Sequence, residues 1–306
     1  MTAAPTVAIV GLTGFLAKHV INALISEPYK SQISTPIRLV TRDETKAKAA
    51  IPAIEASPDL FKFYKADAAT GEGLAEAFEG ATAIVNLAGT GFSHDKISDA
   101  AAKAKTNLYV ASEFGVPTTE KALGKYAPVF DFKIKATQQA RDKGLKTVAV
   151  YNGLFTEFAF RVPGAGGLQS TTEAQTYVPD KEYATTSLVD IGRSVAALVT
   201  KSATPEEAGK LPDELFIKGG SLSGKTVADI ISKLTGKEVA LTEKPQNEIV
   251  DRATQVVENG VKGRDDFFAV LQALFTQGLA DYEANAEAVI ADAFETPEEV
   301  AKRVFK

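Results

Sequence analysis

Short apolar runs alternate with amphipathic stretches along the first half of the chain. The runs are rich in Val, Ile and Ala and nearly continuous, as is typical of strands that are covered on both faces of a sheet. The strands predicted from this pattern are Thr6–Val10, Ile37–Thr41, Phe61–Lys65, Ala83–Leu87, Asn107–Ala111 and Thr147–Tyr151.

The stretches between these runs have the periodicity of helices. They are Phe15–Ser26, Glu44–Ala50, Gly73–Phe78, Lys96–Lys105 and Phe130–Lys143. Strands separated by helices form a parallel sheet with right-handed crossovers. The pattern predicts an α/β fold of the Rossmann type, a doubly wound parallel sheet, over residues 1–155.

The second half of the chain has a different pattern, which predicts a smaller, mainly helical lobe over residues 156–306. Strands near residues 183–218 are expected to complete the sheet, so the two parts are interleaved. The predicted elements of this half are the loop Val162–Gly167, the helices Leu188–Lys201 and Thr226–Leu234, and the strand Glu214–Lys218. After Pro245 the pattern is almost wholly helical, with breaks at Gly260, Gly263 and Gly278. Thr296 and Pro297 begin the last predicted helix.

Composition narrows the chemistry. The 306 residues include no Cys and two His, which excludes thiolate catalysis and argues against a metal site. The net charge of −5 and the lack of a dense basic block argue against nucleic-acid binding. No stretch approaches the roughly 20 apolar residues that span a membrane, and no signal peptide is visible, so a cytoplasmic location is expected.

A glycine turn, Gly-Leu-Thr-Gly, connects the first predicted strand to the first predicted helix. In doubly wound sheets a dinucleotide pyrophosphate sits at this point, because glycines let it approach the backbone and the helix N-terminus offers free N–H groups. Gly11, Thr13 and Gly14 are therefore candidate cofactor contacts, with Ala17 as the third small position. The alternative is that the glycines only make a tight turn.

The second predicted strand ends in Thr41 and Arg42. NAD-specific folds favour a carboxylate at this position, whereas a guanidinium suits the 2′-phosphate of NADP. The sequence thus favours NADP over NAD. The alternative is that Arg42 is only a solvated surface charge, and the neighbouring Asp43 leaves this alternative open. Residues 86–91, at the end of the fourth strand, are expected to pass beneath the nicotinamide, because Ala88 and Gly89 allow close approach.

Several blocks resemble the NmrA-like and isoflavone-reductase-like proteins, which are atypical short-chain dehydrogenases. They are GLTGFLAKHVINAL near the start, YVASEFG at 109–115, F-x-x-K at 130–133, VAVYNGLF at 148–155 and DIGR at 190–193. The resemblance implies an NADPH-binding Rossmann domain, a smaller substrate lobe and an active-site lysine, Lys133. The chain departs from the plant reductases at Ala17 and Thr137, where they carry Gly and Arg.

The cofactor contacts expected from the turn, the strand ends and the resemblance together form one set. They are Gly11, Thr13, Gly14, Phe15, Leu16, Thr41, Arg42, Leu87, Ala88, Gly89, Lys133, Tyr151, Asn152 and Phe155. Tyr151, Asn152 and Phe155 are expected to form the floor of the pocket, although an aromatic residue there could equally belong to the core.

Lys133 is the candidate catalytic residue. Hydride transfer to a carbonyl or an activated alkene builds negative charge on oxygen, which an ammonium group stabilises and can protonate. Lys133 could instead only bind the cofactor. Two other candidates are weaker. Tyr177 and Lys181 have the Tyr-x-x-x-Lys spacing, but Pro179 disfavours a helix there, and Tyr126 is separated from Lys133 by Pro128.

The function predicted from these residues is an NADPH-dependent reductase of a small carbonyl or activated alkene, with an aromatic substrate in view. The alternatives are an NADP-sensing regulator and a Rossmann scaffold without a nucleotide. Retention of Lys133 in its motif favours the reductase. A small-molecule substrate is the expected partner, and the oligomeric state stays open.

Overall fold

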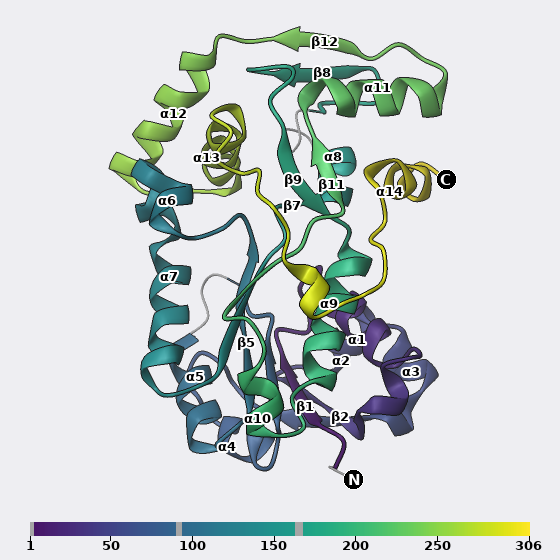
Figure 1. Cartoon of the computed structure of the whole chain (residues 1–306), viewed down its shortest axis with the longest axis vertical. Coiled ribbons are helices and arrows are strands. Elements are labelled where there is room, and N and C mark those ends of the chain that lie inside the picture. Colours follow the sequence, from purple (N-terminus) through teal and green to yellow (C-terminus); the bar gives the residue numbers. More distant parts are fainter. Residues whose placement is uncertain (1–2, 90–93, 163–167) are drawn as a thin grey trace.

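The computed structural model describes residues 3–89, 94–162 and 168–306. A seven-stranded sheet forms the lower half of the molecule in Figure 1, and every pairing in it is parallel. Its order, β10-β6-β5-β4-β1-β2-β3, confirms the doubly wound Rossmann-type fold. The strands are β1 (Thr6–Val10), β2 (Ser34–Thr41), β3 (Phe61–Lys65), β4 (Ala83–Asn86), β5 (Leu108–Gly115), β6 (Thr147–Tyr151) and β10 (Glu214–Phe216).

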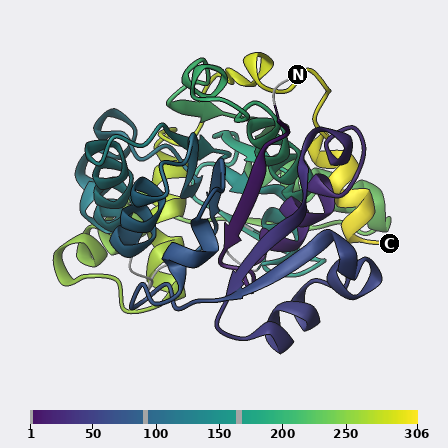
Figure 2. The ribbon, with the colours of Figure 1, turned by 90° about the horizontal axis from the view of Figure 1, so that it is seen from below.

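Helices cover both faces of this sheet, as Figure 2 shows along the strands from below. Val7 and Ile9 of β1 pack in one apolar cluster with α1 (Ala17–Leu24), α2 (Glu44–Ala50), α3 (Ala53–Ala56) and α9 (Leu188–Thr200). Ala8 and Val10 pack in another with α4 (Leu74–Phe78), α5 (His94–Lys103) and α7 (Ala127–Asp142). Successive side chains of a strand point to opposite faces, so a strand buried on both faces reads as a continuous apolar run.

Strand β5 is longer than its apolar pattern predicts. The prediction ends at Ala111, whereas the strand continues through Ser112 and Glu113 to Gly115, which pairs with Tyr151 of β6 beyond a shift in register. The prediction ended the strand where the polar residues begin. In the structure these polar residues are part of β5, which reaches the edge of a cavity described below.

Helix α7 also starts earlier than predicted. Pro128 was expected to interrupt a helix, but it lies in the first turn of α7, where its missing N–H leaves no hydrogen bond unmade. Tyr126 lies in the preceding 3₁₀ turn η3 (Gly124–Tyr126), which follows α6 (Glu120–Leu123).

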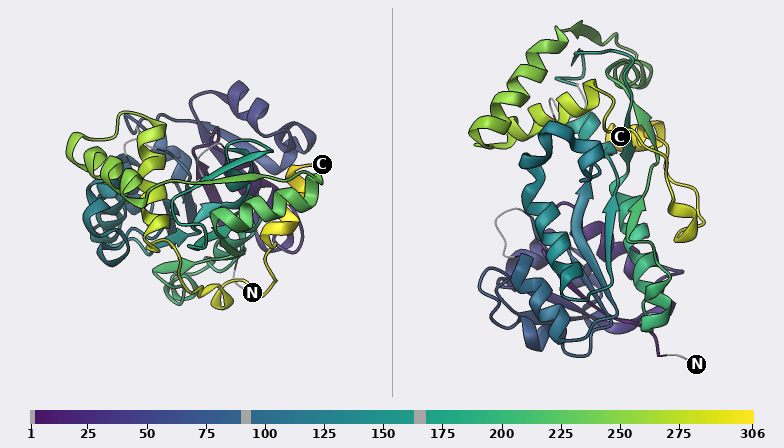
Figure 3. Two further views of the ribbon diagram at one scale, coloured as in Figure 1. Left: turned by 90° about the horizontal axis from the view of Figure 1, so that it is seen from above. Right: turned by 60° about the vertical axis from the view of Figure 1, so that its left-hand side comes forward.

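Most elements after β6 form the upper half of Figure 1, and their buried side chains form an apolar cluster of their own. The exceptions are α9, β10 and α10 (Pro205–Gly209), which lie with the central sheet. The upper half includes a three-stranded sheet of β7 (Leu154–Phe155), β9 (Tyr183–Thr186) and β11 (Gly220–Leu222), and a pair of β8 (Glu173–Thr176) and β12 (Ala240–Glu243). Its helices are α8 (Thr156–Arg161), α11 (Gly224–Thr235), α12 (Gln246–Asn259), α13 (Arg264–Thr276) and α14 (Pro297–Val304). Figure 3 shows the α12–α13 pair above the upper end of α7.

Two expectations about this half need correction. Of the later strands, only β10 joins the central sheet, where it pairs with β6. Strand β9 instead pairs with β7 and β11 in a separate three-stranded sheet. The stretch between α13 and α14 contains only the 3₁₀ turn η4 (Ala286–Ala288), so the pattern after Pro245 is not almost wholly helical. Of the predicted loop Val162–Gly167, residues 163–167 lie outside the described residues.

No helix in the described ranges is both long and apolar enough to cross a lipid bilayer. The described residues also include no group of three or more His, Asp or Glu side chains arranged to hold a metal ion.

Gly192 allows α9 to pack closely on α1. A Cβ atom at Gly192 would lie 2.5 Å from the carbonyl oxygen of His19, a contact with backbone that cannot move aside easily. We therefore expect Gly192→Ala to lower the free energy of unfolding by about 1–3 kcal/mol in a denaturant titration. Gly209→Ala is the matched control, since nothing lies within 4 Å of its Cβ position, and equal stability of the two variants would contradict this packing account.

Candidate active site

The glycine turn after β1 lies directly against the end of β4. Gly11 has a φ of +90°, and a Cβ atom there would sit 2.4 Å from the carbonyl carbon of Leu87. A larger residue at Gly11 would therefore be strained and would collide with backbone. The turn can follow this path only because Gly11 has no side chain.

Gly14 is different, because the protein itself does not require a glycine there. The nearest atom to a Cβ at Gly14 is the Gly11 carbonyl oxygen at 3.6 Å, an ordinary contact. Helix α1 begins just beyond, with no side chain capping it and no acidic residue in its first turn. The exposed turn at Thr13 and Gly14 thus presents open space beside a helix start that no side chain caps, which is a suitable cradle for a phosphate group.

At the end of β2, Arg42 extends into solvent and Asp43 turns away from it. The Arg42 side chain is 61% exposed and makes a long ion pair with Asp67 at 3.6 Å. Asp43 caps α2 by accepting from the backbone N–H of Lys46 at 3.0 Å, and this hydrogen bond holds the pKa of Asp43 below its usual value. The hydroxyl of Thr41 accepts from the backbone N–H of Asp43, so Thr41 shapes the same turn.

A cavity of about 870 Å³ opens beside the glycine turn. It is bounded by the ends of β1, β4, β5 and β7 and by helices α7, α8 and α13. Among the predicted site residues, those that line it are Gly14, Phe15, Leu16, Leu87, Ala88, Gly89, Lys133 and Phe155. Those that do not line it are Gly11, Thr13, Thr41, Arg42, Tyr151 and Asn152.

Lys133 is on the cavity wall, held from α7 over the end of β5. Its ammonium group donates a hydrogen bond to the backbone carbonyl of Glu113. Burial lowers the pKa of Lys133, while the nearby Glu113 carboxylate acts in the opposite direction. A desolvated ammonium gives up its proton more readily than a solvated one, so Lys133 can act as a proton donor as well as a positive charge.

The Glu113 side chain is buried beneath this lysine and is 1% exposed. One carboxyl oxygen accepts from the hydroxyl of Thr137 at 2.6 Å, and the other accepts from that of Thr118 at 3.2 Å. Since the Thr118 hydroxyl donates to Glu113, the Tyr151 hydroxyl donates to Thr118 at 3.0 Å. A fixed buried carboxylate therefore lies next to Lys133. It belongs to the motif YVASEFG, from which the sequence alone assigned no role to Glu113.

Tyr151 and Asn152 do not form the floor of the cavity, contrary to expectation. Tyr151 packs its ring on Phe216 with centroids 5.2 Å apart, and burial raises its pKa to about 12. The Asn152 side chain is fully buried. Both residues belong to the core behind the cavity, which was the alternative given for an aromatic residue at this strand end. Phe155, four residues after Tyr151, does reach the cavity wall.

His94 lies close to Lys133 at the edge of the cavity. Asn86 fixes its ring, because the Asn86 amide oxygen accepts from the Ala88 N–H and its amide nitrogen donates to His94 Nδ1 at 3.0 Å. His94 Nε2 then donates to the Gly89 carbonyl at 3.2 Å. Burial lowers the pKa of His94, as does the charge of Lys133. His94 therefore serves as a neutral clamp on the end of β4.

Aromatic rings form much of the cavity wall. Phe158 of α8 meets Phe15 and Phe155 edge-on at 5.3 and 5.1 Å between centroids. On the other side, Phe130 of α7 contacts Phe267 of α13 at 5.6 Å. The sequence predicted Phe155 at the pocket, but it could not show that helices distant in the chain bring these rings around one space.

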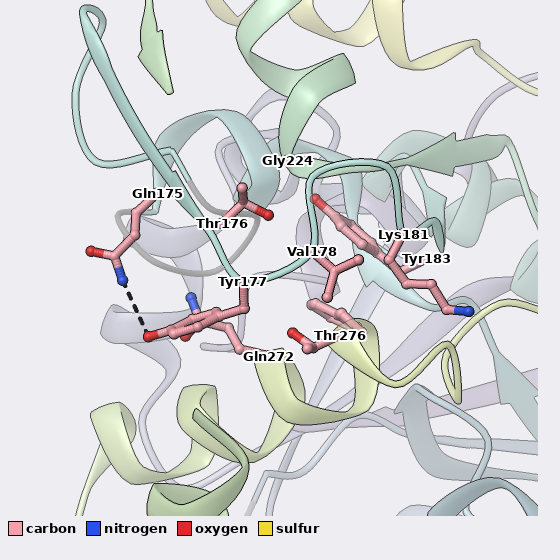
Figure 4. Close-up of a pocket in the computed structure, with 10 residues that line it drawn as sticks. Gln175, Thr176, Tyr177, Val178, Lys181, Tyr183, Gly224, Gln272 and Thr276 are labelled. Carbon is pink, nitrogen blue, oxygen red and sulfur yellow. Dashed lines mark hydrogen bonds between the residues drawn. The ribbon is translucent and has the colours of Figure 1, made fainter. Parts of the chain in front are cut away.

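The Tyr-x-x-x-Lys spacing at Tyr177 and Lys181 does not form a catalytic pair. Figure 4 shows both beside a small pocket, with the Tyr177 hydroxyl turned towards Gln175 and the Lys181 ammonium at the opposite side. Gln175 donates to the Tyr177 hydroxyl at 3.1 Å. Tyr126 likewise is engaged elsewhere, since its hydroxyl accepts from Gln277 at 2.6 Å.

With this geometry established, the class of protein follows from the comparison with family models. The NmrA-like family model matches residues 3–272. The chain therefore belongs to the NmrA-like family, as the resemblance in its sequence predicted. No curated protein matches the chain.

Solved structures of similar fold include three reductases. An NADPH-dependent quinone oxidoreductase from Escherichia coli, in complex with NADPH, is 18% identical with a TM-score of 0.73, covering 98% of this chain and 100% of that one. A triphenylmethane reductase from Citrobacter sp. with NADP(H) is 17% identical with a TM-score of 0.72 and the same coverage. An isoflavone reductase is 16% identical with a TM-score of 0.76, covering 98% and 99%.

Glu113→Gln tests whether the buried carboxylate sets the acidity of Lys133. Removing its negative charge leaves the effect of burial unopposed, so the pKa of Lys133 should fall further. The measurement is a pH titration by NMR of ¹³C-methylated lysines, with the Lys133 signal assigned from its loss in Lys133→Arg. Glu44→Gln, an exposed carboxylate paired with Lys48, should leave that signal unchanged. An unchanged or raised pKa in Glu113→Gln would show that the carboxylate does not control Lys133.

Proposed function

We propose that this protein is an NADPH-dependent reductase that transfers hydride to a small carbonyl or activated alkene compound with an aromatic ring. The observation that carries the proposal is the position of Lys133. It is a partly buried ammonium with a lowered pKa, on the wall of an aromatic cavity that also reaches the exposed glycine turn at Gly14. The NADP(H) complexes of two similar folds support the same cofactor here.

In this proposal the cofactor follows the edge of the sheet where β1 and β4 separate. The turn from Gly11 through Thr13 and Gly14 to Phe15 and Leu16 holds the pyrophosphate. The segment Leu87–Gly89 and Phe155 border the nicotinamide, and Lys133 reaches its ribose. Residues 1–155 thus supply most cofactor contacts, and residues 156–306 supply most of the substrate-binding surface.

Arg42 would contact the 2′-phosphate that distinguishes NADPH from NADH. Its guanidinium is free to turn towards such a group, because its ion pair with Asp67 is long and largely exposed. The neighbouring carboxylate that could instead accept from a ribose hydroxyl, Asp43, is engaged in capping α2. Both observations favour NADPH over NADH, with Thr41 shaping the turn.

The bound cofactor would supply the hydride, and the chain would handle the charge that follows. Lys133 faces the cavity, where its ammonium would stabilise negative charge developing on the substrate oxygen. Its lowered pKa would favour transfer of a proton to that oxygen. The Glu113 carbonyl and carboxylate hold the lysine in place from below, and His94 fixes the strand end opposite. A Lys133 that only clamps the cofactor would bind NADPH without turnover.

Parallel fluorescence titrations with NADPH and NADH test the cofactor assignment. Wild-type protein should bind NADPH at least about tenfold more tightly, and Arg42→Ala should remove most of this preference, since one charge-assisted phosphate contact contributes roughly 1–3 kcal/mol. Lys30→Ala is the control, an exposed cation at the opposite end of β2. Absence of binding by either cofactor would reject the proposal.

Substitution of Lys133 separates a reductase from a cofactor-sensing regulator. Against a panel of aldehydes, quinones and enones, Lys133→Met should lower kcat by about 10²–10⁴-fold, the usual contribution of a general acid. The NADPH dissociation constant should rise by only about 2–10-fold, as expected for the loss of one hydrogen bond to the ribose. Oxidation of NADPH is followed at its absorbance band. Tight NADPH binding without turnover on any substrate would instead favour the NADP-sensing regulator.

A further inference from the structure

The ionisable side chains that line the large cavity are all basic. They are His94, Lys133, Lys262 and Arg264, and none of the lining residues in the described ranges is Asp or Glu. The chain as a whole carries 39 acidic and 34 basic residues, so a wall without carboxylates is not a reflection of its composition. The cavity is therefore suited to a ligand that carries negative charge.

Lys262 and Arg264 form a second cationic position, separate from Lys133. They come from the turn between α12 and α13 and from the first residue of α13, whereas Lys133 comes from α7. In the described part of the chain, neither side chain makes an ion pair with a carboxylate. Two carboxylates follow directly in sequence: Asp265 is exposed, and Asp266 accepts from the Lys262 backbone N–H at 3.0 Å and faces Arg252 at 4.0 Å.

The apolar wall near these cations is unusually open. Four large apolar side chains are exposed in the described residues, and three of them line this cavity: Phe15 at 71%, Val261 at 45% and Phe132 at 37%. The guanidinium of Arg264 lies over the ring of Phe268, 5.8 Å from its centroid. Apolar surface of this kind, next to unpaired positive charge, fits a ligand with an aromatic body and an anionic group.

We propose that the substrate is an aromatic compound bearing a carboxylate or sulfonate, with its rings against Phe130, Phe267 and Phe268 and its anion at Lys262 and Arg264. This inference rests on the proposed reductase function, because it names the substrate class for the same cavity. The reducible group would then point inwards to Lys133, and the anion would lie at the mouth, where it remains partly solvated.

The cofactor is the competing source of negative charge. Its pyrophosphate is assigned above to the glycine turn at Gly11 and Gly14, on the other side of the cavity from α13. If Lys262 and Arg264 served the cofactor instead, their removal would weaken NADPH binding. The test therefore measures both ligands.

Two fluorescent probes with the same aromatic skeleton separate charge from shape. 8-Anilinonaphthalene-1-sulfonate carries a sulfonate, and N-phenyl-1-naphthylamine lacks it. With no cofactor present, Arg264→Ala and Lys262→Ala should each weaken binding of the sulfonate about 5–10-fold, as expected for a partly exposed charge contact, and change binding of the neutral probe less than twofold. High salt should weaken only the sulfonate.

Two control variants locate the probes. Phe267→Ala should weaken both probes, because it removes a ring from the cavity wall, and Lys237→Ala, an exposed lysine away from the cavity, should affect neither. Equal effects of Arg264→Ala on both probes, or no effect on either, would overturn the proposal. A loss of NADPH affinity in Arg264→Ala with unchanged sulfonate binding would overturn it as well and would assign these cations to the cofactor.

The outcome is independent of whether the reductase function holds. The probe titrations need no cofactor or turnover, so a protein that fails to bind NADPH can still bind the sulfonate preferentially. Where turnover is found, 1,4-naphthoquinone and its 2-sulfonate provide the matching substrate pair. Arg264→Ala should raise KM about 5–10-fold for the sulfonate alone, with kcat retained.

Discussion

The close approach of the Gly11 backbone to the end of β4 is the constraint on which the site depends. A side chain at Gly11 would sit within 2.4 Å of the Leu87 backbone, so the turn could not lie where it does. Because β1 and β4 neighbour each other at the switch in strand order, their helical connections leave on opposite faces of the sheet and a crevice opens between them. The uncapped start of α1 and the large cavity both border this crevice.

The second determinant is how Lys133 is held at the edge of that crevice. The extension of β5 beyond its apolar run brings the Glu113 carbonyl under the ammonium and buries the Glu113 carboxylate between Thr118 and Thr137. Burial favours the neutral lysine and the carboxylate favours the charged one, so the two effects oppose each other at one atom. The local fold thus sets the pKa of Lys133, on which the proposed proton transfer to the substrate depends.

Much of the fold was predictable because its signals are local. Strands such as Phe61–Lys65 and helices such as Glu44–Ala50 have the predicted bounds, since apolar periodicity reflects burial on one or both faces. The short strands β7, β8, β11 and β12 were missed, because two to four residues carry no periodicity. Tyr151 was assigned to the pocket from its place at a strand end, yet its side chain points into the core. The cation pair at Lys262 and Arg264 and the role of His94 were not found from the sequence, because they depend on contacts between distant segments. Glu113 lies in the motif YVASEFG, but the motif could not show that its carboxylate is buried next to Lys133.

In the proposed reductase, one cofactor spans Arg42, the glycine turn and Lys133. A crystal structure of the protein with NADP⁺ would test this placement. We expect the 2′-phosphate within hydrogen-bonding distance of Arg42, the pyrophosphate over Gly11 to Gly14, and the nicotinamide in the cavity beside Lys133. A cofactor bound away from the glycine turn, or a nicotinamide on the far side of the cavity from Lys133, would contradict it.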